Sequence, residues 1–535
     1  MSLAFLGALC ILSSPVRIVV IGDRTGGSND PEFEASLQAA ALLCPDVVVN
    51  VGDLIEGYSE DVAELSTQWD HVLAILDGYL RDIPLVLVPG NHDITYDAAE
   101  GVWRERTGVE PSRVAELEGV VFVVWDTSRM GWPDSAEIAG LEGLLEGVGR
   151  SDTAVLLTHQ PFWMMEGDTA TARRIRDLAE LYDLEAVIGG HIHTWSSESS
   201  NGVLYVSTCT CGGDFGSRDV ASGRFTEIAW LTLDGDSASM AVVDPYGIYP
   251  PEINTVEEEN LLFSIENRLL DFRPLESALE SATLTLHNVE EVPRTVAIEV
   301  EPGSWGLSPD SLVVDLAEGE TRSVYLSQNP SGSPWPAPAV TASIEYGPRN
   351  KTASLEAGWP VLRSLRVPEA EVAIDGIRSA DEYPGPVETE FASPDGRRSA
   401  IGETSMAVSR DGGRLCVHCS MTILEGATFE DEAFAVVVCG EDVVFRVKVF
   451  PDGGVSAITG GPSGISPLDS GFEAAAIAGE GAWDAEIALD LGEIGMEGDS
   501  VPASFYRLGA GGESASWTWP LEFDARHMGI VETGR

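Results

Sequence analysis

Metal-binding residue types stand directly after several apolar runs in the first half of this 535-residue chain. The runs VRIVVIGD, PDVVVNVGD, PLVLVPGNHD, AVLLTHQPF and EAVIGGHIH end in or just before Asp23, Asp53, Asn91 with His92, His159, and His191 with His193. Four of the eight histidines of the chain lie in these places. Asp, Asn and His without cysteine suit ions such as Mn, Fe, Co or Zn, and not an all-oxygen calcium site. We therefore predict a transition-metal site.

The elements that would position these residues follow from the same runs. Each run is nearly continuously apolar, which is typical of strands buried on both faces. The segment PEFEASLQAAALL (31–43) has the spacing of an amphipathic helix between the first two strands. Alternating strands and helices predict a layered α/β domain over residues 15–250. In such sheets functional groups gather at the carboxyl ends of strands, although Asp23 taken alone could equally cap the next helix.

The order of the motifs resembles the calcineurin-like metallophosphoesterases. The matching stretches are GDRT at 22–25, GD at 52–53, GNHD at 90–93, THQP at 158–161 and GHIH at 190–193. The resemblance implies a phosphoric ester hydrolase in which two ions activate a water that attacks phosphorus. It implies three sets of metal ligands: Asp53 as the bridge, Asp23 with His193 on one ion, and Asn91, His159 and His191 on the other. His92 and Asp53 would be the catalytic residues, and Asn91 and His92 would also contact the substrate.

Two positions near the first motifs depart from the family pattern. Thr25 stands where the family usually has a histidine, so we expect the first ion to be bound more weakly. A variant that lacks this histidine has a tyrosine three residues after the second-motif Asp, where this chain has Glu56, and Tyr58 comes two residues later. Arg24 could hold a phosphate oxygen of the substrate, or it could pair with a carboxylate of this acidic chain.

Composition excludes some partners. The formal net charge is −56, from 87 acidic and 31 basic residues. Such a surface repels phosphate backbones and anionic lipid, so we expect a small phosphate ester as partner and no nucleic-acid surface. Cys416 and Cys419 form a CxxC motif within a predicted strand, where they face opposite sides and cannot share a metal. One of them could pair with Cys439 in an oxidising compartment.

The N-terminal residues suggest export. The stretch MSLAFLGALCILSSP contains an apolar run of signal-peptide length, although it lacks a positive start. We expect a signal peptide over residues 1–14 and an extracellular or periplasmic location; an extra N-terminal strand is the alternative. No stretch reaches the ~18 apolar residues that a membrane span needs.

Two strand-rich blocks follow the first domain. Residues 251–277 are expected to form a linker, and residues 278–365 show the period-two alternation of an immunoglobulin-like β-sandwich. Residues 366–535 resemble DOMON-like sandwiches, which include the family-nine carbohydrate-binding modules, through VAIDGIRSADEY, AWDAEIALDLGEIG and ASWTWP. There Trp517 and Trp519 would share one face that could stack on a polysaccharide, or both could belong to the core.

Two functions remain open. The first is an exported, metal-dependent phosphoesterase acting on a monoester or diester, with β domains for spacing or glycan binding. The second is a non-catalytic glycan-binding or adhesion protein with a degenerate first domain, which only Thr25 favours.

Overall fold

The computed structural model describes residues 14–129, 131–149, 152–164, 169–235, 237–276, 279–393, 403–422, 432–440, 443–461, 464–479, 481–496, 498, 500–509, 514–518 and 528–533. Its contacts divide the chain into two compact units. The first unit comprises Met1–Phe263 and Gly347–Lys351, and the second comprises Ser264–Tyr346 and Thr352–Arg535. The expected signal peptide lies almost wholly outside the described residues.

The first unit contains two six-stranded sheets. One has the order β12-β11-β10-β1-β2-β3, with β1 (Val16–Ile21), β2 (Val47–Asn50), β3 (Leu85–Leu87), β10 (Ile228–Leu233), β11 (Ala238–Asp244) and β12 (Gly247–Tyr249). The other has the order β4-β5-β6-β7-β9-β8, with β4 (Arg113–Leu117), β5 (Val120–Val124), β6 (Thr153–Leu157), β7 (Ala186–Gly189), β8 (Ser196–Ser200) and β9 (Val203–Ser207).

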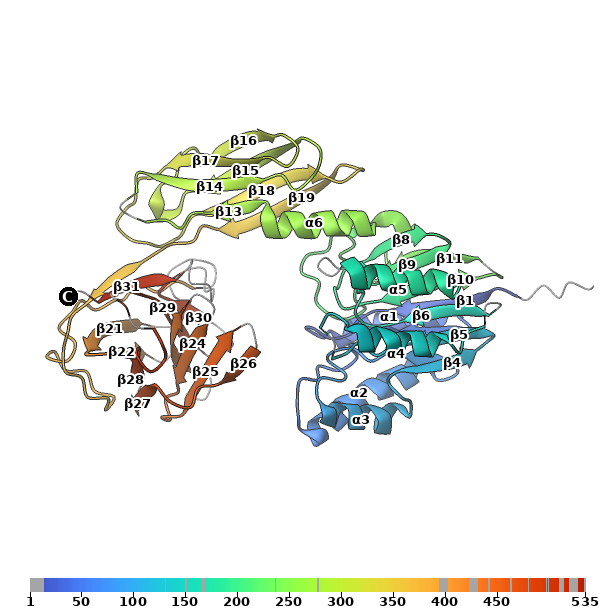
Figure 1. Cartoon of the computed structure of the whole chain (residues 1–535), viewed down its shortest axis with the longest axis horizontal. Coiled ribbons are helices and arrows are strands. Elements are labelled where there is room, and N and C mark those ends of the chain that lie inside the picture. Colours follow the sequence, from blue (N-terminus) through green and yellow to red (C-terminus); the bar gives the residue numbers. More distant parts are fainter. Residues whose placement is uncertain are drawn as a thin grey trace, which may run out of the picture. The chain divides into compact units, whose positions relative to one another are not determined.

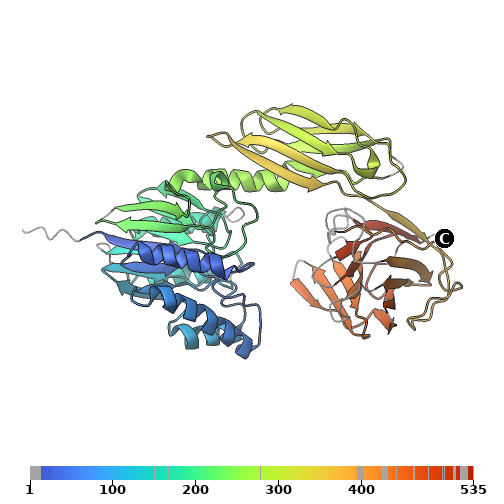
Figure 2. The same ribbon diagram turned by 180° about the vertical axis from the view of Figure 1, so that it is seen from behind.

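Helices cover the outer face of each sheet. They are α1 (Asp30–Leu42), α2 (Val62–Leu80), α3 (Asp97–Thr107), α4 (Ser135–Leu145) and α5 (Thr169–Leu181). Helices α4 and α5 are in front in Figure 1, whereas α1 and α2, in blue, are in front in Figure 2. Alternate residues of β1 divide between two cores: Ile18 and Val20 pack between the sheets, and Val19 and Ile21 pack under α1 to α3. The predicted layered α/β domain, with strands buried on both faces, is therefore confirmed.

The parallel registers bring the carboxyl ends of the site-bearing strands together. In the first sheet Ile21 of β1 is level with Asn50 of β2, which is level with Leu87 of β3. In the second sheet Leu157 of β6 is level with Ile188 of β7. The residues that follow each strand therefore meet at one edge of their sheet.

The second unit holds two β-sandwiches. The first pairs β13-β14-β17 with β16-β15-β18-β19, and its elements are β13 (Leu270–Phe272), β14 (Ser281–His287), β15 (Arg294–Glu301), η3 (Gly303–Trp305), β16 (Ser311–Leu316), β17 (Thr321–Ser327), β18 (Ala339–Tyr346) and β19 (Lys351–Gly358). In β15 every second residue is buried, as the alternation predicted. The expected linker is structured: it contains η2 (Pro251–Ile253), helix α6 (Val256–Arg268) and β13, which pairs with β14 of the sandwich.

The C-terminal sandwich has a sheet in the order β20-β31-β29-β23-β24-β25-β26, with β30 beside β29, and a sheet in the order β21-β22-β28-β27. Its strands are β20 (Ser364–Val367), β21 (Thr404–Asp411), β22 (Arg414–Thr422), β23 (Ala433–Cys439), β24 (Val444–Val449), β25 (Val455–Gly461), β26 (Gly464–Pro467), β27 (Phe472–Ala478), β28 (Ala482–Asp490), β29 (Ser500–Leu508), β30 (Ser514–Ser516) and β31 (Gly529–Thr533). Strands β21 and β22 pair antiparallel as one hairpin, and β23 and β24 pair as another.

Cysteines of this domain behave as small core residues. Cys419 belongs to the core between the sheets, and Cys416 packs on the other face with Tyr383. The expectation that the CxxC residues face opposite sides is confirmed. Cys416 and Cys419 are buried with free thiols, so neither forms a disulfide with Cys439.

Two segments that connect the strands of the first unit are partly helical. GYSEDVAELSTQWD enters helix α2 at Val62, after Asp61 accepts hydrogen bonds from the backbone N–H groups of Ala63 and Glu64. WMMEGDTATARR enters helix α5 at Thr169, and its residues 165–168 lie outside the described part. The signal for the helix in the first segment was Asp61, a residue type that favours the N-cap.

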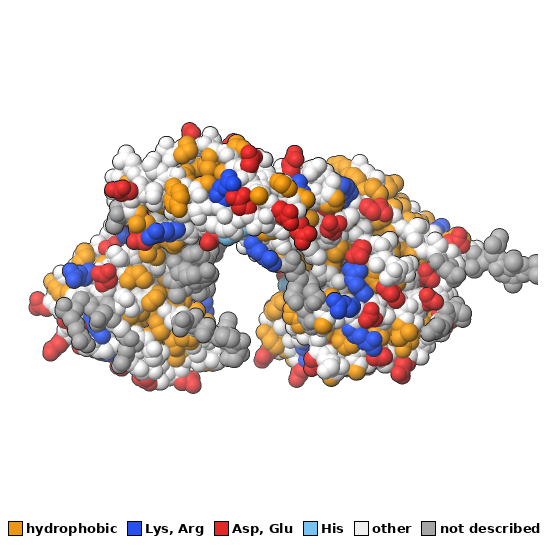
Figure 3. Space-filling view, turned by 45° about the horizontal axis from the view of Figure 1, so that its top comes forward, with side chains coloured by type: hydrophobic (Ala, Val, Ile, Leu, Met, Phe, Trp, Pro, Cys, Tyr) orange, Lys and Arg blue, Asp and Glu red, His pale blue; other side chains and the backbone are white. Residues whose placement is uncertain are grey.

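On the face that Figure 3 shows, Lys and Arg side chains are scattered among Asp and Glu.

Candidate metal centre and active site

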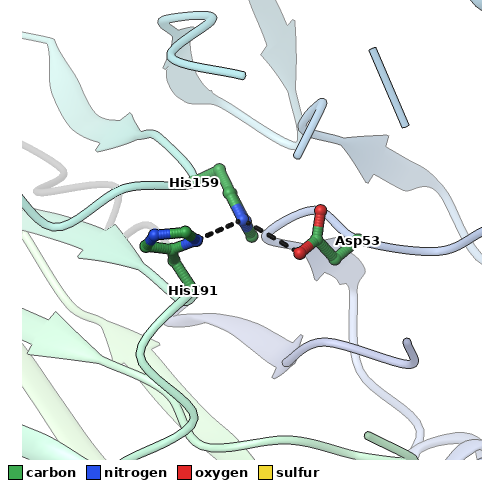
Figure 4. A group of neighbouring side chains, drawn as sticks. All are labelled: Asp53, His159 and His191. Atoms are coloured by element: carbon green, nitrogen blue, oxygen red, sulfur yellow. Dashed lines mark hydrogen bonds and ion pairs between the residues drawn. The ribbon is translucent and has the colours of Figure 1, made fainter. Parts of the chain in front are cut away.

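His159 is the centre of the densest group of ligand atoms in the first unit. Its Nε2 lies 3.2 Å from Asp53 Oδ2, 2.9 Å from Asn91 Oδ1 and 3.2 Å from His191 Nδ1. Figure 4 shows His159 between Asp53 and His191. Among the described residues, these three form the only group of three or more His, Cys, Asp or Glu side chains close enough to hold an ion. The structure therefore brings together the set Asn91, His159 and His191 that the sequence predicted, with Asp53 beside it.

Hydrogen bonding determines which nitrogen of His159 faces this group. Its Nδ1 lies 2.9 Å from the carbonyl oxygen of Val51, which can only accept a hydrogen bond. Nδ1 therefore carries a hydrogen, and Nε2 is the atom that can bind a cation. A backbone carbonyl on the far nitrogen is the usual support for a metal-binding histidine.

The charges in the group are strongly coupled. Burial opposes ionisation of Asp53, but the neighbouring His159 outweighs it and brings the pKa of Asp53 to about 2. Burial likewise disfavours the charged form of His159, yet Asp53 raises its pKa to about 10. Burial and the charge of His159 lower the pKa of His191 to about 4. Without a metal, His159 thus carries the proton that a bound cation would replace.

Asp23 and His193 form a second pair. Asp23 is fully buried, and its Oδ2 lies 3.2 Å from Nε2 of His193. The same oxygen accepts a hydrogen bond of 3.1 Å from the backbone N–H of His191. Nδ1 of His193 donates to the carbonyl oxygen of Asp214, so its Nε2 is free to bind a cation. Burial opposes the charged form of His193, while Asp23 raises its pKa.

Thr25 occupies the position where the family usually has a metal-binding histidine. It is fully buried, and its hydroxyl has no hydrogen-bond partner among the described residues. Its backbone N–H bonds to the carbonyl oxygen of Asp53 at 3.1 Å. Because an unpaired buried hydroxyl is costly, this position favours occupation by a water or an ion when the site is loaded.

Two glycines of the motifs are required because a carboxylate oxygen of the site lies against the backbone at each of them. A Cβ on Gly90 would lie 2.0 Å from Asp53 Oδ1, and one on Gly190 would lie 2.3 Å from Asp23 Oδ1. The backbone is also unusual at the ligands: Asp53, His191 and His193 have φ values of 57°, 72° and 51°. Such left-handed conformations in non-glycine residues cost free energy and gather at functional sites.

Asp93, the last residue of GNHD, has a role that the sequence reasoning missed. It is fully buried and accepts hydrogen bonds from the backbone N–H groups of Asp53, Leu54, Ile55 and Gly90, at 2.8 to 3.2 Å. It therefore holds the loop after β2 against the loop after β3. The only signal in the sequence was its place in the motif.

His92 stands at the opening of the site. Its backbone N–H donates to Asp53 Oδ1 at 2.9 Å, and its Nδ1 donates to the carbonyl oxygen of Glu56 at 2.8 Å. Nε2 lies 4.0 Å from Asp53 Oδ2. The ring thus directs Nε2 toward the donor group and holds it there by two backbone contacts.

Arg24 does not take the role of substrate ligand that was considered for it. The side chain is buried, its Nη1 donates to the carbonyl oxygen of Leu54 at 2.8 Å, and its guanidinium pairs with Asp30. The alternative, pairing with a carboxylate, is the one observed. Arg24 ties the loop after β1 to the loop after β2 and to the start of α1.

The aromatic face considered for glycan binding is also absent at Trp517. This side chain is 1% exposed and belongs to the sandwich core, with Phe505 edge-on at 5.3 Å. Its indole N–H points to Glu388 at 3.4 Å. Trp517 is therefore a core residue and offers no surface for stacking a sugar. Trp519 lies outside the described residues.

The donor set fits transition-metal ions. Two donors bonded to one ion at about 2.1 Å and an angle near 100° lie about 3.2 Å apart. The separations of His159 Nε2 from its three neighbours, 2.9 to 3.2 Å, match this spacing. The donors are one carboxylate, one amide oxygen and two imidazoles, with no thiolate, which suits Mn, Fe, Co or Zn.

Comparison with known proteins agrees with these motifs. Residues 16–195 match the family model described as calcineurin-like phosphoesterase. A protein of Psychrobacter sp. (strain PRwf-1), described as a "probable cyclic nucleotide phosphodiesterase", is 27% identical over 209 residues, which are 35% of this chain and 58% of the relative. This chain thus spans less than two thirds of that relative.

Solved structures resemble separate parts of the chain. A dimetal phosphatase from Danio rerio covers 42% of this chain and 98% of its own, with 11% identity and a TM-score of 0.30. A family-nine carbohydrate-binding module from Caldicellulosiruptor kristjanssonii, solved with cellotriose, covers 32% of this chain and 95% of its own, with 12% identity and a TM-score of 0.24. Within the described residues, no helix is both long and apolar enough to span a bilayer. The N-terminal α/β domain thus matches the calcineurin-like phosphoesterase family model over residues 16–195, in agreement with its motifs.

Proposed function

We propose that the N-terminal domain hydrolyses a phosphate monoester or diester with two divalent transition-metal ions. The observation that carries the proposal is the convergence of Asp53, Asn91 and His191 on Nε2 of His159. These groups come from four separate strand ends, and their separations match those of ligands to one ion. A structural role alone would not require three acceptor atoms around one buried imidazole.

The residues divide between two ions in this proposal. Asn91, His159 and His191 would hold one ion, Asp23 and His193 would hold the other, and Asp53 would serve both. Ions at these positions would supply Lewis-acid stabilisation of the phosphoryl oxygens. Thr25 makes the second set smaller by one imidazole, so its ion is the more weakly bound.

His92 supplies the proton to the departing oxygen. Its Nδ1 hydrogen is held by the carbonyl oxygen of Glu56, so any proton it transfers leaves from Nε2. That atom faces the donor group, 4.0 Å from Asp53 Oδ2. Asp53 Oδ1 accepts the backbone N–H of His92, which keeps the ring beside the donor group.

We further propose that the chain is exported and that its β domains act as spacers. The apolar stretch near the N-terminus supports export. N-terminal sequencing of the protein recovered outside the cytoplasm tests it, because export would remove about the first 14 residues. Recovery of an intact N-terminus only in the cytoplasm would contradict it.

The function is tested with bis(p-nitrophenyl) phosphate and p-nitrophenyl phosphate, using protein reconstituted with Mn²⁺. We expect His159→Asn to lose at least about 100-fold in turnover together with bound Mn²⁺, because it removes the central ligand. His287→Asn is the matched control, since His287 lies on β14 of the sandwich and bonds to Thr321. If the unaltered protein cleaves neither ester with Mn²⁺, Fe²⁺, Co²⁺ or Zn²⁺, the non-catalytic binding protein becomes the better interpretation.

A further inference from the structure

Tyr58 is an exposed aromatic residue held rigidly at the edge of the metal-donor group. Its side chain is 55% exposed, and its φ of 49° is left-handed. The preceding residues are fixed on both sides: the carbonyl oxygen of Glu56 accepts from His92 at 2.8 Å, and the N–H of Gly57 donates to Gln68 at 2.9 Å. Gly57 packs so closely that a Cβ would lie 1.7 Å from the carbonyl oxygen of His92. The exposed ring is therefore anchored.

The Tyr58 hydroxyl contacts one of the candidate metal ligands. It accepts a hydrogen bond of 2.8 Å from Nδ2 of Asn91, whose Oδ1 lies 2.9 Å from Nε2 of His159. Since the phenol oxygen is the acceptor, its own hydrogen remains available for donation. In the part of the chain that the structure describes, no acceptor for that hydrogen is found.

The ring of Tyr58 lies beside the proposed proton donor. Its centroid is 4.7 Å from that of His92, and the rings meet edge to face at 87°. One side chain thus adjoins both the ligand Asn91 and the ring of His92. A phosphate ester that reached the metal donors and His92 would pass within reach of the phenol.

We propose that Tyr58 binds the substrate of the phosphoesterase site. Its hydroxyl donates a hydrogen bond to a non-bridging phosphoryl oxygen, and its exposed ring packs against an organic group of the ester. The substrate class is therefore a phosphodiester with an aromatic or heterocyclic substituent large enough to cover the ring. This inference rests on the proposed function, because it needs a phosphoryl group at the same site.

The first experiment measures binding of inorganic phosphate to the Mn²⁺-loaded full chain by calorimetry. Tyr58→Phe should weaken phosphate binding by on the order of tenfold, because it removes one hydrogen bond to a charged group. Bound Mn²⁺, measured by elemental analysis, should be unchanged. Tyr325→Phe is the matched control, since Tyr325 is 69% exposed on β17 of the sandwich and should change neither quantity.

The second experiment compares bis(p-nitrophenyl) phosphate with methyl p-nitrophenyl phosphate, which differ in one organic group. Tyr58→Ala should lower kcat/KM for the bis-aryl ester more than for the methyl ester, because only the former covers the ring. Equal losses for both esters would overturn the packing role. Unchanged phosphate binding in Tyr58→Phe would overturn the hydroxyl role, as would a loss of Mn²⁺ that parallels the loss of phosphate.

The outcomes separate this inference from the proposed function. Turnover by the unaltered protein with no effect of either Tyr58 variant would reject Tyr58 and keep the phosphoesterase. Phosphate binding that depends on Tyr58, without turnover of any ester, would keep the phosphate contact and reject the catalytic function. Absence of phosphate binding to the unaltered Mn²⁺-loaded protein would reject both.

Discussion

Glu258 provides a prediction whose size can be worked from the structure. It lies in the first turn of α6, is fully buried, and forms ion pairs with Arg349 and with Lys351, the latter at 2.9 Å. The backbone N–H and hydroxyl of Thr255 also donate to its Oε2 at 3.2 Å. Burial opposes ionisation of Glu258, but Arg349 and Lys351 outweigh it and lower its pKa to about 2.

This shift stabilises the first unit, and the stability depends on pH. A carboxyl whose pKa falls from 4.5 when unfolded to about 2 when folded stabilises the folded state above pH 4.5. That contribution is lost as the pH falls toward 2. One pKa unit corresponds to about 1.36 kcal/mol, so the contribution is at most about 3 kcal/mol at pH 7 and falls to about 1 kcal/mol at pH 3.

Glu258→Gln should therefore lower the free energy of unfolding of the first unit by about 3 kcal/mol at pH 7. For a unit of this size that corresponds to a fall in Tm of about 10 °C. Differential scanning calorimetry of the full chain at pH 7, 4 and 3 measures it. Glu257→Gln is the control, because Glu257 is its exposed neighbour. A difference between the variants below about 0.5 kcal/mol at pH 7, or one that does not shrink by pH 3, would refute the reasoning.

Three further predictions concern the site. Gly90→Ala should abolish Mn²⁺ binding while the chain stays folded by circular dichroism. The added Cβ would lie 2.0 Å from Asp53 Oδ1 and must displace that oxygen by about 1 Å, which is more than the ~0.2 Å that metal bonds tolerate. Retained Mn²⁺ binding would contradict this prediction. Thr25→His should increase the affinity of the weaker metal site at least about tenfold in a calorimetric titration, since it adds an imidazole ligand. Two sites whose affinities differ as much as in the unaltered protein would argue against this prediction. Arg24→Ala should lower the free energy of unfolding by about 1 kcal/mol, because Asp30 is partly exposed and keeps its contact with His71, with KM for the ester unchanged in the folded fraction. A raised KM there would restore Arg24 as a substrate ligand.

The positions of the candidate metal donors could be predicted because parallel strands impose them. A residue directly after a buried strand must lie at the carboxyl edge of its sheet, whatever the rest of the chain does. Asp23, Asp53, Asn91, His159 and His191 were found in this way, and all five lie where the pattern placed them. The opposite orientations of Cys416 and Cys419 follow equally from the period of a strand.

Partners that come from distant parts of the chain were beyond such reasoning. Arg24 could face either a substrate or a carboxylate, and the nearby start of α1 decided for Asp30. Trp517 had the spacing of an exposed face, but packing against Phe505 placed it in the core. Neither outcome is encoded in local spacing, because each depends on which surface another segment covers.

The sequence by itself therefore determined the fold class, the motif order and the candidate metal donors, because strand and helix periods act over a few residues. Tertiary structure alone decided the contact of Tyr58 with Asn91, the loop clamp at Asp93 and the burial of Glu258 against Arg349 and Lys351. These contacts join residues separated by 33, 40, 91 and about 93 positions. Their formation depends on the packing of whole elements, which no local pattern specifies.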